Sequence, residues 1–286
     1  MTNSEYFSMF VGEGAELALD YRFFPFSVED GQAFTADSPP GWSPLPPLVN
    51  GGVPISRTTR PVRPEDVTHT RRVRLDSVAR YLHDISQDDL QASGSEDAHH
   101  PWAARRIIID VLRTCKWPTT MTLTRWCARA TTRWLSIRVQ LTDEHGGIIE
   151  TETHWTKINP ITGLPGPISA DYLTRLTDGL LDTGARWMAP TTPTRDDLQR
   201  RPFPLRASDA DVFGRINASV YLQAVEHELH RRQELVDKPH RMTIDHHSTI
   251  RLDTPVQLLI ADDADAVDLT FDVHGTPYAR ARVSLI

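Results

Sequence analysis

Residues 208–221 read SDADVFGRINASVY and place three chemically capable side chains just before a predicted helix. These side chains are Asp211, Arg215 and Asn217. A carboxylate can act as a general base or as a nucleophile toward a carbonyl carbon. The first backbone amides of a helix have no intrahelical acceptor and carry partial positive charge, so they can hold a developing oxyanion. The order of these residues therefore fits attack on a carbonyl group.

Each of these side chains also has a structural interpretation. Asp211 is a common type of residue in a turn before a helix, and Asn217 is a favoured N-cap. Arg215 can be a solvated surface charge, and Phe213 can be a packing residue. If a site exists, Arg215 can support the oxyanion, or it can pair with Asp211 and lower the basicity of that carboxylate. The sequence leaves these interpretations open.

The elements that must position this stretch follow one pattern twice. Residues 74–90 carry apolar side chains at helical spacing, and residues 218–235 do so again. Alternating apolar and polar residues predict four strands after each helix. The predicted strands are 105–113, 119–130, 134–142 and 148–158 in the first half, and 240–252, 254–261, 266–273 and 277–286 in the second.

The two halves can also be aligned directly. Residues 106–123 (RIIIDVLRTCKWPTTMTL) lie over residues 241–258 (RMTIDHHSTIRLDTPVQL) without a gap. Identical residues in this alignment include Arg106 and Arg241, Ile109 and Ile244, Asp110 and Asp245, and Leu123 and Leu258. Upstream, the Asp-Val pairs that begin at Asp66 and Asp211 each precede a helix by a short connection. We therefore predict that one α+β unit is duplicated in this chain.

A long helix followed by an antiparallel sheet that wraps around it is the hotdog pattern. Two copies in one chain resemble the acyl-acyl carrier protein (acyl-ACP) thioesterases. The stretches that carry the resemblance are RVRLDSVARYLHDIS, WAARRIIIDVLRTCKWPTTMTLTRWC and DADVFGRINASVYLQAVEHEL. The resemblance implies an α+β tandem double hotdog. The predicted parts are an N-terminal extension (1–53), a first hotdog domain (54–168), a linker (169–202) and a second hotdog domain (203–286).

The family motif in the second copy resembles D-x-N-x-H-V-N-N-x-x-Y. Asp211, Asn217 and Tyr221 match it. The departures from the motif are Phe213 for asparagine, Arg215 for histidine, Ala218 for the second late asparagine, and Thr249 near the position of a glutamate on a later strand. A looser pattern, D-x-x-G-x-x-N, resembles single-copy hotdog thioesterases that act on acyl-CoA, and Asp211 and Gly214 fit it.

The resemblance implies hydrolysis of long-chain acyl-ACP or acyl-CoA to free fatty acid, as in fatty acid biosynthesis. The implied catalytic residues are Asp211, Arg215 and Asn217. The implied substrate-binding residues are Trp102, Arg105, Phe213 and Tyr221. A second hypothesis is an acyl-thioester-binding protein that has lost turnover because catalytic side chains are replaced. A hotdog dehydratase would need a histidine paired with an acid at this junction, and VFGRIN contains no histidine.

Composition limits the class of protein. The chain has 286 residues and a net charge of -7, which argues against a general nucleic-acid binder. The two cysteines and the absence of a signal peptide or an apolar stretch of ~20 residues favour a cytoplasmic protein without a membrane span.

The expected partners are an acidic carrier protein or CoA, and a homodimer is a possible assembly. A basic patch for the carrier would come from Arg105, Arg106, Arg113 and Lys116, or from Arg200, Arg201 and Arg206. We expect no cofactor, because no phosphate-binding glycine motif is present. We expect no metal, because strand alternation sends His246 and His247 to opposite faces.

Overall fold

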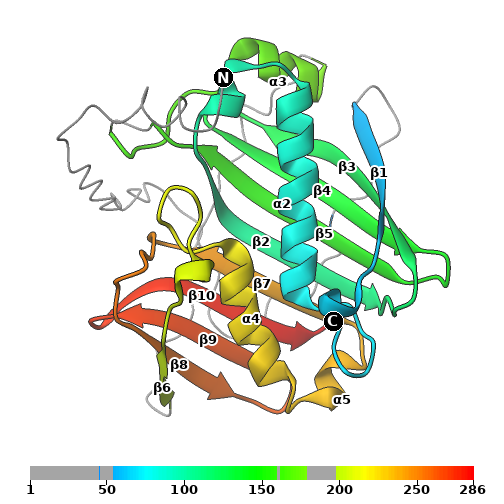
Figure 1. The fold of residues 1–286 in the computed structure, drawn as a ribbon, viewed down its shortest axis with the longest axis vertical. Coiled ribbons are helices and arrows are strands. Elements are labelled where there is room, and N and C mark those ends of the chain that lie inside the picture. The colour runs from blue at the N-terminus through cyan, green and yellow to red at the C-terminus, as the bar shows by residue number, and fades with distance from the viewer. Residues whose placement is uncertain (1–44, 46–53, 160–161, 179–197) are drawn as a thin grey trace, which may run out of the picture.

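The fold was analysed in a computed structural model, which describes residue 45 and residues 54–159, 162–178 and 198–286. The predictions for the N-terminal extension, a strand at 18–26 and an extended segment at 38–48, fall essentially outside the described residues. The chain forms one antiparallel 10-stranded sheet in the order β1-β3-β4-β5-β2-β7-β10-β9-β8-β6. Figure 1 shows the two longest helices lying side by side on one face of this sheet.

The described elements fall into two similar series. The first series is β1 (Ile55–Pro61), η1 (Pro64–Asp66), α2 (Leu75–Ala92), η2 (Glu96–His99), β2 (Trp102–Arg113), β3 (Thr120–Ala130), β4 (Trp134–Asp143), β5 (Ile148–Lys157) and α3 (Ala170–Thr177). The second series is β6 (Gln199–Phe203), η3 (Ala207–Asp209), α4 (Ala218–Leu229), α5 (Gln233–Val236), β7 (His240–His246), β8 (Val256–Asp262), β9 (Ala266–Val273) and β10 (Thr276–Leu285).

The predicted α+β tandem double hotdog is confirmed. The aligned stretches fall on equivalent strands, since residues 106–123 cover β2 and the start of β3 and residues 241–258 cover β7 and the start of β8. The helix predicted over 218–235 is interrupted, because α4 ends at Leu229 and α5 begins at Gln233. The predicted domain limits stay a prediction, and the limit at residue 202 falls inside β6.

The predicted equivalence of Asp66 and Asp211 is wrong. Asp66 ends η1 and accepts a hydrogen bond from the amide of Arg63 at 2.9 Å. Asp209 ends η3 and accepts one from the amide of Arg206 at 2.8 Å. The counterpart of Asp66 is therefore Asp209, because the capping turn and not the Asp-Val pair is what the two copies share.

The two copies join along β2 and β7, at the centre of the sheet. The pairing of Ile108 with Thr243 lies at a local two-fold axis, because these residues are also equivalent in the sequence repeat. Two ion pairs flank this axis symmetrically. Arg106 Nε donates to Asp245 Oδ1 at 2.6 Å, and Arg241 Nε donates to Asp110 Oδ1 at 2.6 Å.

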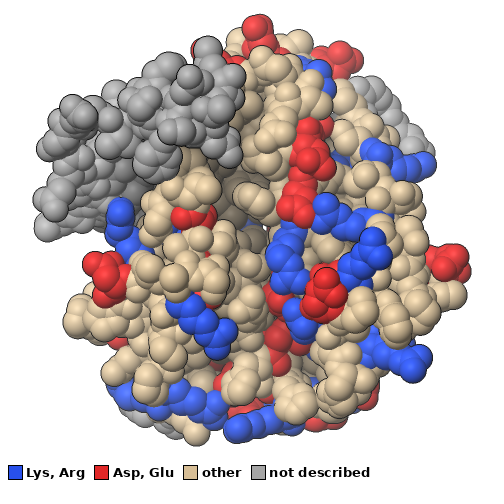
Figure 2. All heavy atoms as spheres, in the orientation of Figure 1, with Lys and Arg blue, Asp and Glu red and all other residues tan. Residues whose placement is uncertain are grey.

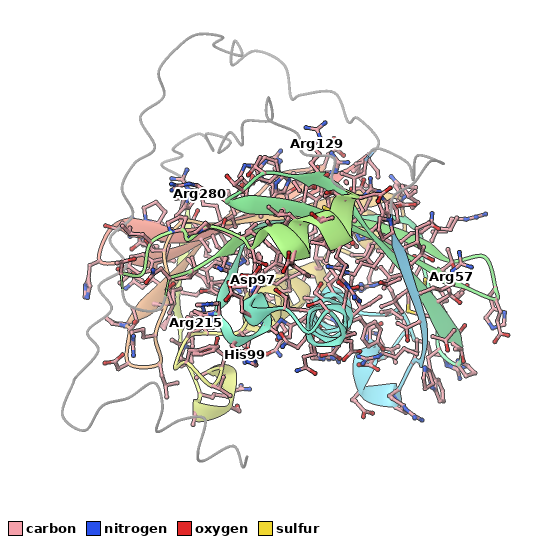
Figure 3. The ribbon with its side chains drawn as sticks, turned by 90° about the horizontal axis from the view of Figure 1, so that it is seen from above. Arg57, Asp97, His99, Arg129, Arg215 and Arg280 are labelled. Carbon is pink, nitrogen blue, oxygen red and sulfur yellow. The ribbon has the colours of Figure 1, made fainter. Side chains whose placement is uncertain are left out.

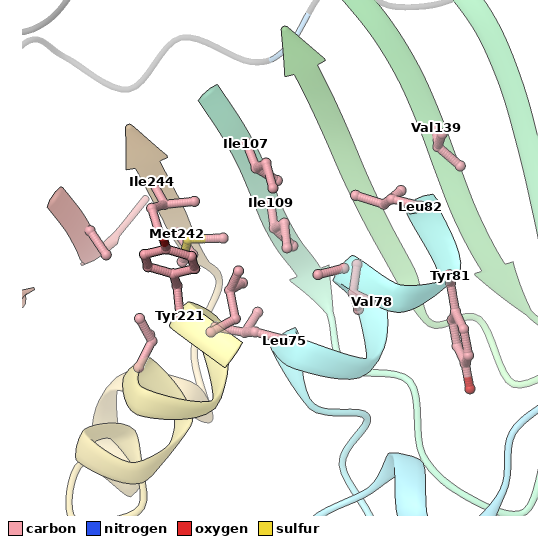
Figure 4. Packing of buried hydrophobic residues seen from close by; sticks show 14 of the residues in the cluster. Leu75, Val78, Tyr81, Leu82, Ile107, Ile109, Val139, Tyr221, Met242 and Ile244 are labelled. Carbon is pink, nitrogen blue, oxygen red and sulfur yellow. The ribbon is translucent and has the colours of Figure 1, made fainter. Parts of the chain in front are cut away.

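The core lies between the sheet and the two helices. The predicted apolar face of α2, which includes Leu75, Val78 and Leu82, is buried. Figure 4 shows this face opposite Ile107 and Ile109 of β2, while Tyr221 of α4 points toward β7. Burial of a large aliphatic side chain contributes about 1.5–3 kcal/mol, so this layer holds both helices against the sheet. No helix in the described ranges is long and apolar enough to cross a membrane.

We predict that Asp110→Ala lowers the free energy of unfolding by about 3 kcal/mol, because it leaves the guanidinium of Arg241 without its carboxylate at the central strand pair. The side chain of Asp110 is only 1% exposed. Urea denaturation measures the effect. The matched control is Asp84→Ala, which removes the carboxylate of an exposed ion pair with Arg60 and should cost about 1 kcal/mol or less. Equal losses in the two variants would contradict the prediction.

Candidate active site at the N-terminus of helix α4

The segment before α4 is a tight turn built around the carboxylate of Asp211. The amide of Asp211 donates to the carbonyl of Arg215 at 2.6 Å, and the amide of Gly214 donates to the carbonyl of Asp211 at 2.9 Å. Oδ1 of Asp211 accepts the amides of Phe213 and Arg215 at 2.8 and 2.9 Å. Gly214 has a φ of 70°, a conformation that residues with a Cβ rarely adopt. The turn is therefore held in one shape by the side chain that would do chemistry.

Arg215 pairs with Asp211, which was one of its two predicted roles. Nε and NH2 of Arg215 each lie 2.9 Å from Oδ2 of Asp211. The guanidinium carbon also lies 4.9 Å from the ring centroid of Phe213. Figure 3 shows Arg215 on the helix side of the sheet, while Arg129 and Arg280 lie on the other side. Both Asp211 oxygens are thus engaged by donors of the same short segment.

Phe213 is not a packing residue of the core. Its side chain is 54% exposed, and its neighbour Val212 is 79% exposed. Asn217 occupies the predicted N-cap position of α4. Its side chain makes no capping bond, however, and its Nδ2 donates to the carbonyl of Asp209 at 3.2 Å. The turn, and not a packed or capping side chain, therefore sets the entry into α4.

The first turn of α4 contains no acidic residue and no capping side chain among the described residues. The equivalent end of α2 is different. Oε1 of Glu226, from the last turn of α4, accepts the amide of Leu75 at 2.6 Å, and the carboxylate also binds Arg72 at 2.6 and 3.0 Å. A carboxylate therefore occupies one of the two helix N-termini of the tandem.

Arg72 and Arg215 are equivalent in the two copies. Arg72 forms an isolated bridge with Lys116, and Arg215 forms the matching bridge with Arg251. Arg72 reaches across to the other copy and binds Glu226, whereas Arg215 binds Asp211 within its own turn. Glu226 could not be predicted from the sequence, because a single glutamate inside a helix carries no local signal for a contact with the other copy.

Tyr221 and Trp102, two of the predicted substrate-binding residues, lie in different parts of the fold. Tyr221 lies in the first turns of α4, is 3% exposed, and contacts His246 of β7 with ring centroids 4.8 Å apart. Burial raises the pKa of Tyr221. Trp102 instead packs against Tyr172 of α3, with ring centroids 6.1 Å apart, and its Nε1 donates to the carbonyl of Asp97 at 3.1 Å. Tyr221 therefore lies in α4, whereas Trp102 lies beside α3.

His246 and His247 lie on opposite faces, as predicted. His246 contacts Tyr221 on the helix side, and the charges that act on His247 are Asp245, Arg280 and Arg106. Burial, with the nearby charge of Arg105, lowers the pKa of His246 to about 3. In the described part of the chain, no group of three or more His, Cys, Asp or Glu side chains is arranged to hold a metal ion. His246 is a functional candidate that the sequence analysis did not assign.

One arginine of each predicted basic patch is bound in an ion pair. Arg106 is bound to Asp245, and Arg201 donates to Glu228 at 2.7 Å. Figure 2 shows basic and acidic side chains intermixed on the helix face.

The fold and the site together define a tandem double-hotdog protein with one open helix N-terminus beside a carboxylate.

Comparison with known proteins agrees with this class. The family model for the acyl-ACP thioesterase N-terminal domain matches residues 56–176, and the model for the C-terminal domain matches residues 193–276. The chain is 32% identical over 216 residues to the "uncharacterized protein Rv2001" of Mycobacterium tuberculosis, covering 76% of this chain and 86% of that protein. The chain belongs to the acyl-ACP thioesterase family.

Two solved structures share the fold. The 12:0-ACP thioesterase from Umbellularia californica has a TM-score of 0.65 and 16% identity, covering 80% of this chain and 96% of that one. An acyl-ACP thioesterase from Bacteroides thetaiotaomicron has a TM-score of 0.65 and 16% identity, covering 80% and 97%. Family membership supports thioester hydrolysis as the class of activity.

We predict that Gly214→Ala lowers the free energy of unfolding by about 1–2 kcal/mol, because a residue with a Cβ is strained at this φ. The added Cβ would lie 3.7 Å from NH2 of Arg251, so the cost comes from the backbone and not from a clash. Thermal denaturation measures it. The control is Gly166→Ala, where the added Cβ meets only ordinary contacts at 3.6 Å or more. If the two variants lost the same stability, the turn would not have this conformation.

We also predict that stability falls as the pH is lowered from about 6.5 toward 3. His246 has its pKa lowered to about 3 in the folded state, so below about 6.5 the unfolded chain binds a proton that the folded chain does not. His240 and His247 also have lowered pKa values and act in the same direction. Urea denaturation of His246→Gln at pH 6 and pH 4 should show a slope reduced by up to about 1.4 kcal/mol per pH unit.

The control for this experiment is His145→Gln, since the side chain of His145 is 63% exposed in the β4–β5 turn. That variant should keep the slope of the parent protein. An unchanged slope in His246→Gln would show that His246 is protonated equally in the folded and unfolded states.

Proposed function

We propose that this protein hydrolyses long-chain acyl thioesters of ACP or CoA at the N-terminus of α4, with Asp211 as the general base. The observation that carries the proposal is the contrast between the two helix N-termini. The amide of Leu75 at the start of α2 is bound to Glu226. The start of α4 has no such carboxylate in the described residues and follows the Asp211 turn directly. An open helix N-terminus beside a fixed carboxylate suits an oxyanion and an attacking water.

The bonds change in two steps. As Asp211 takes a proton from water, the water oxygen forms a bond to the thioester carbonyl carbon, and the carbonyl electrons move to oxygen. The first amides of α4, near Asn217, hold this oxyanion. When the carbonyl reforms, the C–S bond breaks, and the proton on Asp211 goes to the departing sulfur. The products are a fatty acid and the free thiol of the carrier.

Asp211 is better suited to act as a base than as a nucleophile. Its oxygens already accept bonds from the amides of Phe213 and Arg215 and from the Arg215 guanidinium. A carboxylate held in this way can orient a water molecule, whereas covalent attack would require it to leave these donors. In this proposal Arg215 is a positioning residue, and the exposed Phe213 meets the substrate beside it.

A second candidate function is acyl-thioester binding without turnover. The observation that favours it is the ion pair between Arg215 and Asp211 at 2.9 Å. Arg215 stands where the family motif has histidine. Trp102, Arg105 and Tyr221 serve as proposed substrate-binding residues under either function. A panel of acyl-CoA and acyl-ACP substrates, with release of free thiol as the signal, separates hydrolysis from binding.

We predict that Asp211→Asn lowers kcat for thioester hydrolysis by ~10²–10⁴-fold while acyl binding persists, because the change keeps the shape and removes the base. The matched control is Asp262→Asn, an exposed carboxylate bound to Arg232, which should leave kcat unchanged. Activity of Asp211→Asn within two-fold of the parent protein would exclude Asp211 as the base. Stoichiometric binding of an acyl thioester without any hydrolysis by the parent protein would favour the second function.

A further inference from the structure

His246 has a buried ring nitrogen with no partner. Its Nε2 is enclosed and makes no hydrogen bond. The ring meets Tyr221 edge to face, with centroids 4.8 Å apart and planes at 82°. Buried polar atoms in folded proteins are nearly always paired, so an unpaired one calls for a physical explanation. Nδ1, by contrast, is not among the enclosed unpaired atoms, and the residue as a whole is half-buried.

The segment that follows His246 runs beside the start of α4. The amide of Ile216 donates to the carbonyl of Ile250 at 3.0 Å, and Arg215 bridges to Arg251. Tyr221, in the first turns of α4, has a hydrogen bond with the backbone of Ile250. These contacts tie the exit of β7 to the turn and to the first residues of the helix. His246, the last residue of β7, therefore lies in the wall of the proposed site.

Arg105 lies at the end of the β2–β7 ladder, where His246 follows on the neighbouring strand. The ladder between β2 and β7 ends at the pair of Arg106 and Asp245, and the β2–β5 register shifts between Ala104 and Arg106. Bulges of this kind change the direction of a side chain and occur beside active sites. The positive charge of Arg105 acts on His246 and disfavours an imidazolium. His246 is therefore a neutral imidazole of lowered basicity, which can donate a hydrogen bond from its ring N–H.

The unpaired Nε2 also indicates where the ring proton is. A buried N–H donor without an acceptor is rarer in folded proteins than a buried lone pair without a donor. The neutral ring thus favours the proton on Nδ1 and the lone pair on the enclosed Nε2. This tautomer places the N–H group at Nδ1, the ring nitrogen that is not enclosed.

Resting on the proposed function, we propose that Nδ1–H of His246 donates a hydrogen bond to the thioester carbonyl oxygen, in place of the histidine that the family motif has at the position of Arg215. No proton is transferred by His246 in this role. The bond strengthens as negative charge develops on the oxygen, so it lowers the barrier to attack more than it strengthens substrate binding. His246 and the first amides of α4 then act on the same oxygen.

The kinetic test compares three variants with palmitoyl-CoA as substrate. His246→Phe keeps a flat ring against Tyr221 and removes the donor, and it should lower kcat by ~10²–10³-fold with KM within a few-fold. His246→Gln restores an N–H donor and should recover at least about ten-fold of that loss. His247→Phe, one residue away on the opposite face, is the matched control and should stay within two-fold of the parent protein. Activity of His246→Phe within two-fold would overturn the proposal.

A spectroscopic test separates this inference from the proposed function. Palmitoyl-CoA labelled with ¹³C at the carbonyl is bound to Asp211→Asn protein, and the infrared carbonyl stretch is measured with and without His246→Phe. A hydrogen bond lowers that frequency, so the shift on binding should be present in the first protein and reduced in the second. An identical shift in both would overturn the role of His246, whether or not the parent protein turns over substrate.

A third measurement needs no substitution at residue 246. Asp211→Asn protein labelled with ¹⁵N-histidine should show a change at Nδ1 of His246 when palmitoyl-CoA is added, while the resonances of His247 stay in place. This arm decides the question if His246→Phe does not fold. An unchanged Nδ1 resonance at saturating palmitoyl-CoA would overturn the proposal.

Discussion

The antiparallel pairing of β2 with β7 is the interaction on which the rest of the structure depends. It joins two five-stranded halves into one sheet and places a local two-fold axis at Ile108 and Thr243. The flanking pairs, Arg106 with Asp245 and Arg241 with Asp110, fix the register. A shift by one residue would turn every side chain of these strands to the opposite face. The position of each helix relative to the other copy follows from this register.

The two-fold arrangement brings the end of α4 to the start of α2, and this contact makes the two helix N-termini unequal. Glu226 reaches the amide of Leu75 and the guanidinium of Arg72, both in the first copy. A helix N-terminus that already holds a carboxylate has little capacity for a second negative charge. The start of α4 keeps that capacity. The duplication thus produces one helix N-terminus that is bound by a carboxylate and one that is not, from two copies of the same fold.

The open end also shows how the replacement of a motif histidine changes a site. Arg215 brings a permanent charge, and it is used to hold Asp211 in the turn at 2.9 Å. A neutral donor for a carbonyl oxygen must then come from elsewhere. His246, at the end of β7, contacts Tyr221, and burial lowers the pKa of its imidazole. The proposed site therefore combines residues from β7, α4 and the turn before it.

The sequence by itself determined the duplicated α+β unit, the strands and the place where α4 begins. These features depend on spacing within a helix or strand and on an ungapped repeat, which are local and periodic. The alternation along β7 also sent His246 and His247 to opposite faces.

Only the tertiary structure decided the contacts between distant residues. The pairing of Arg215 with Asp211, the exposure of Phe213 and the hydrogen bond from Asn217 to the carbonyl of Asp209 all depend on the three-dimensional shape of one turn. Glu226 and Leu75 are separated by 151 residues, and no local pattern relates them. A side chain chooses among several partners according to distance and burial, and those quantities exist only once the two copies have packed together.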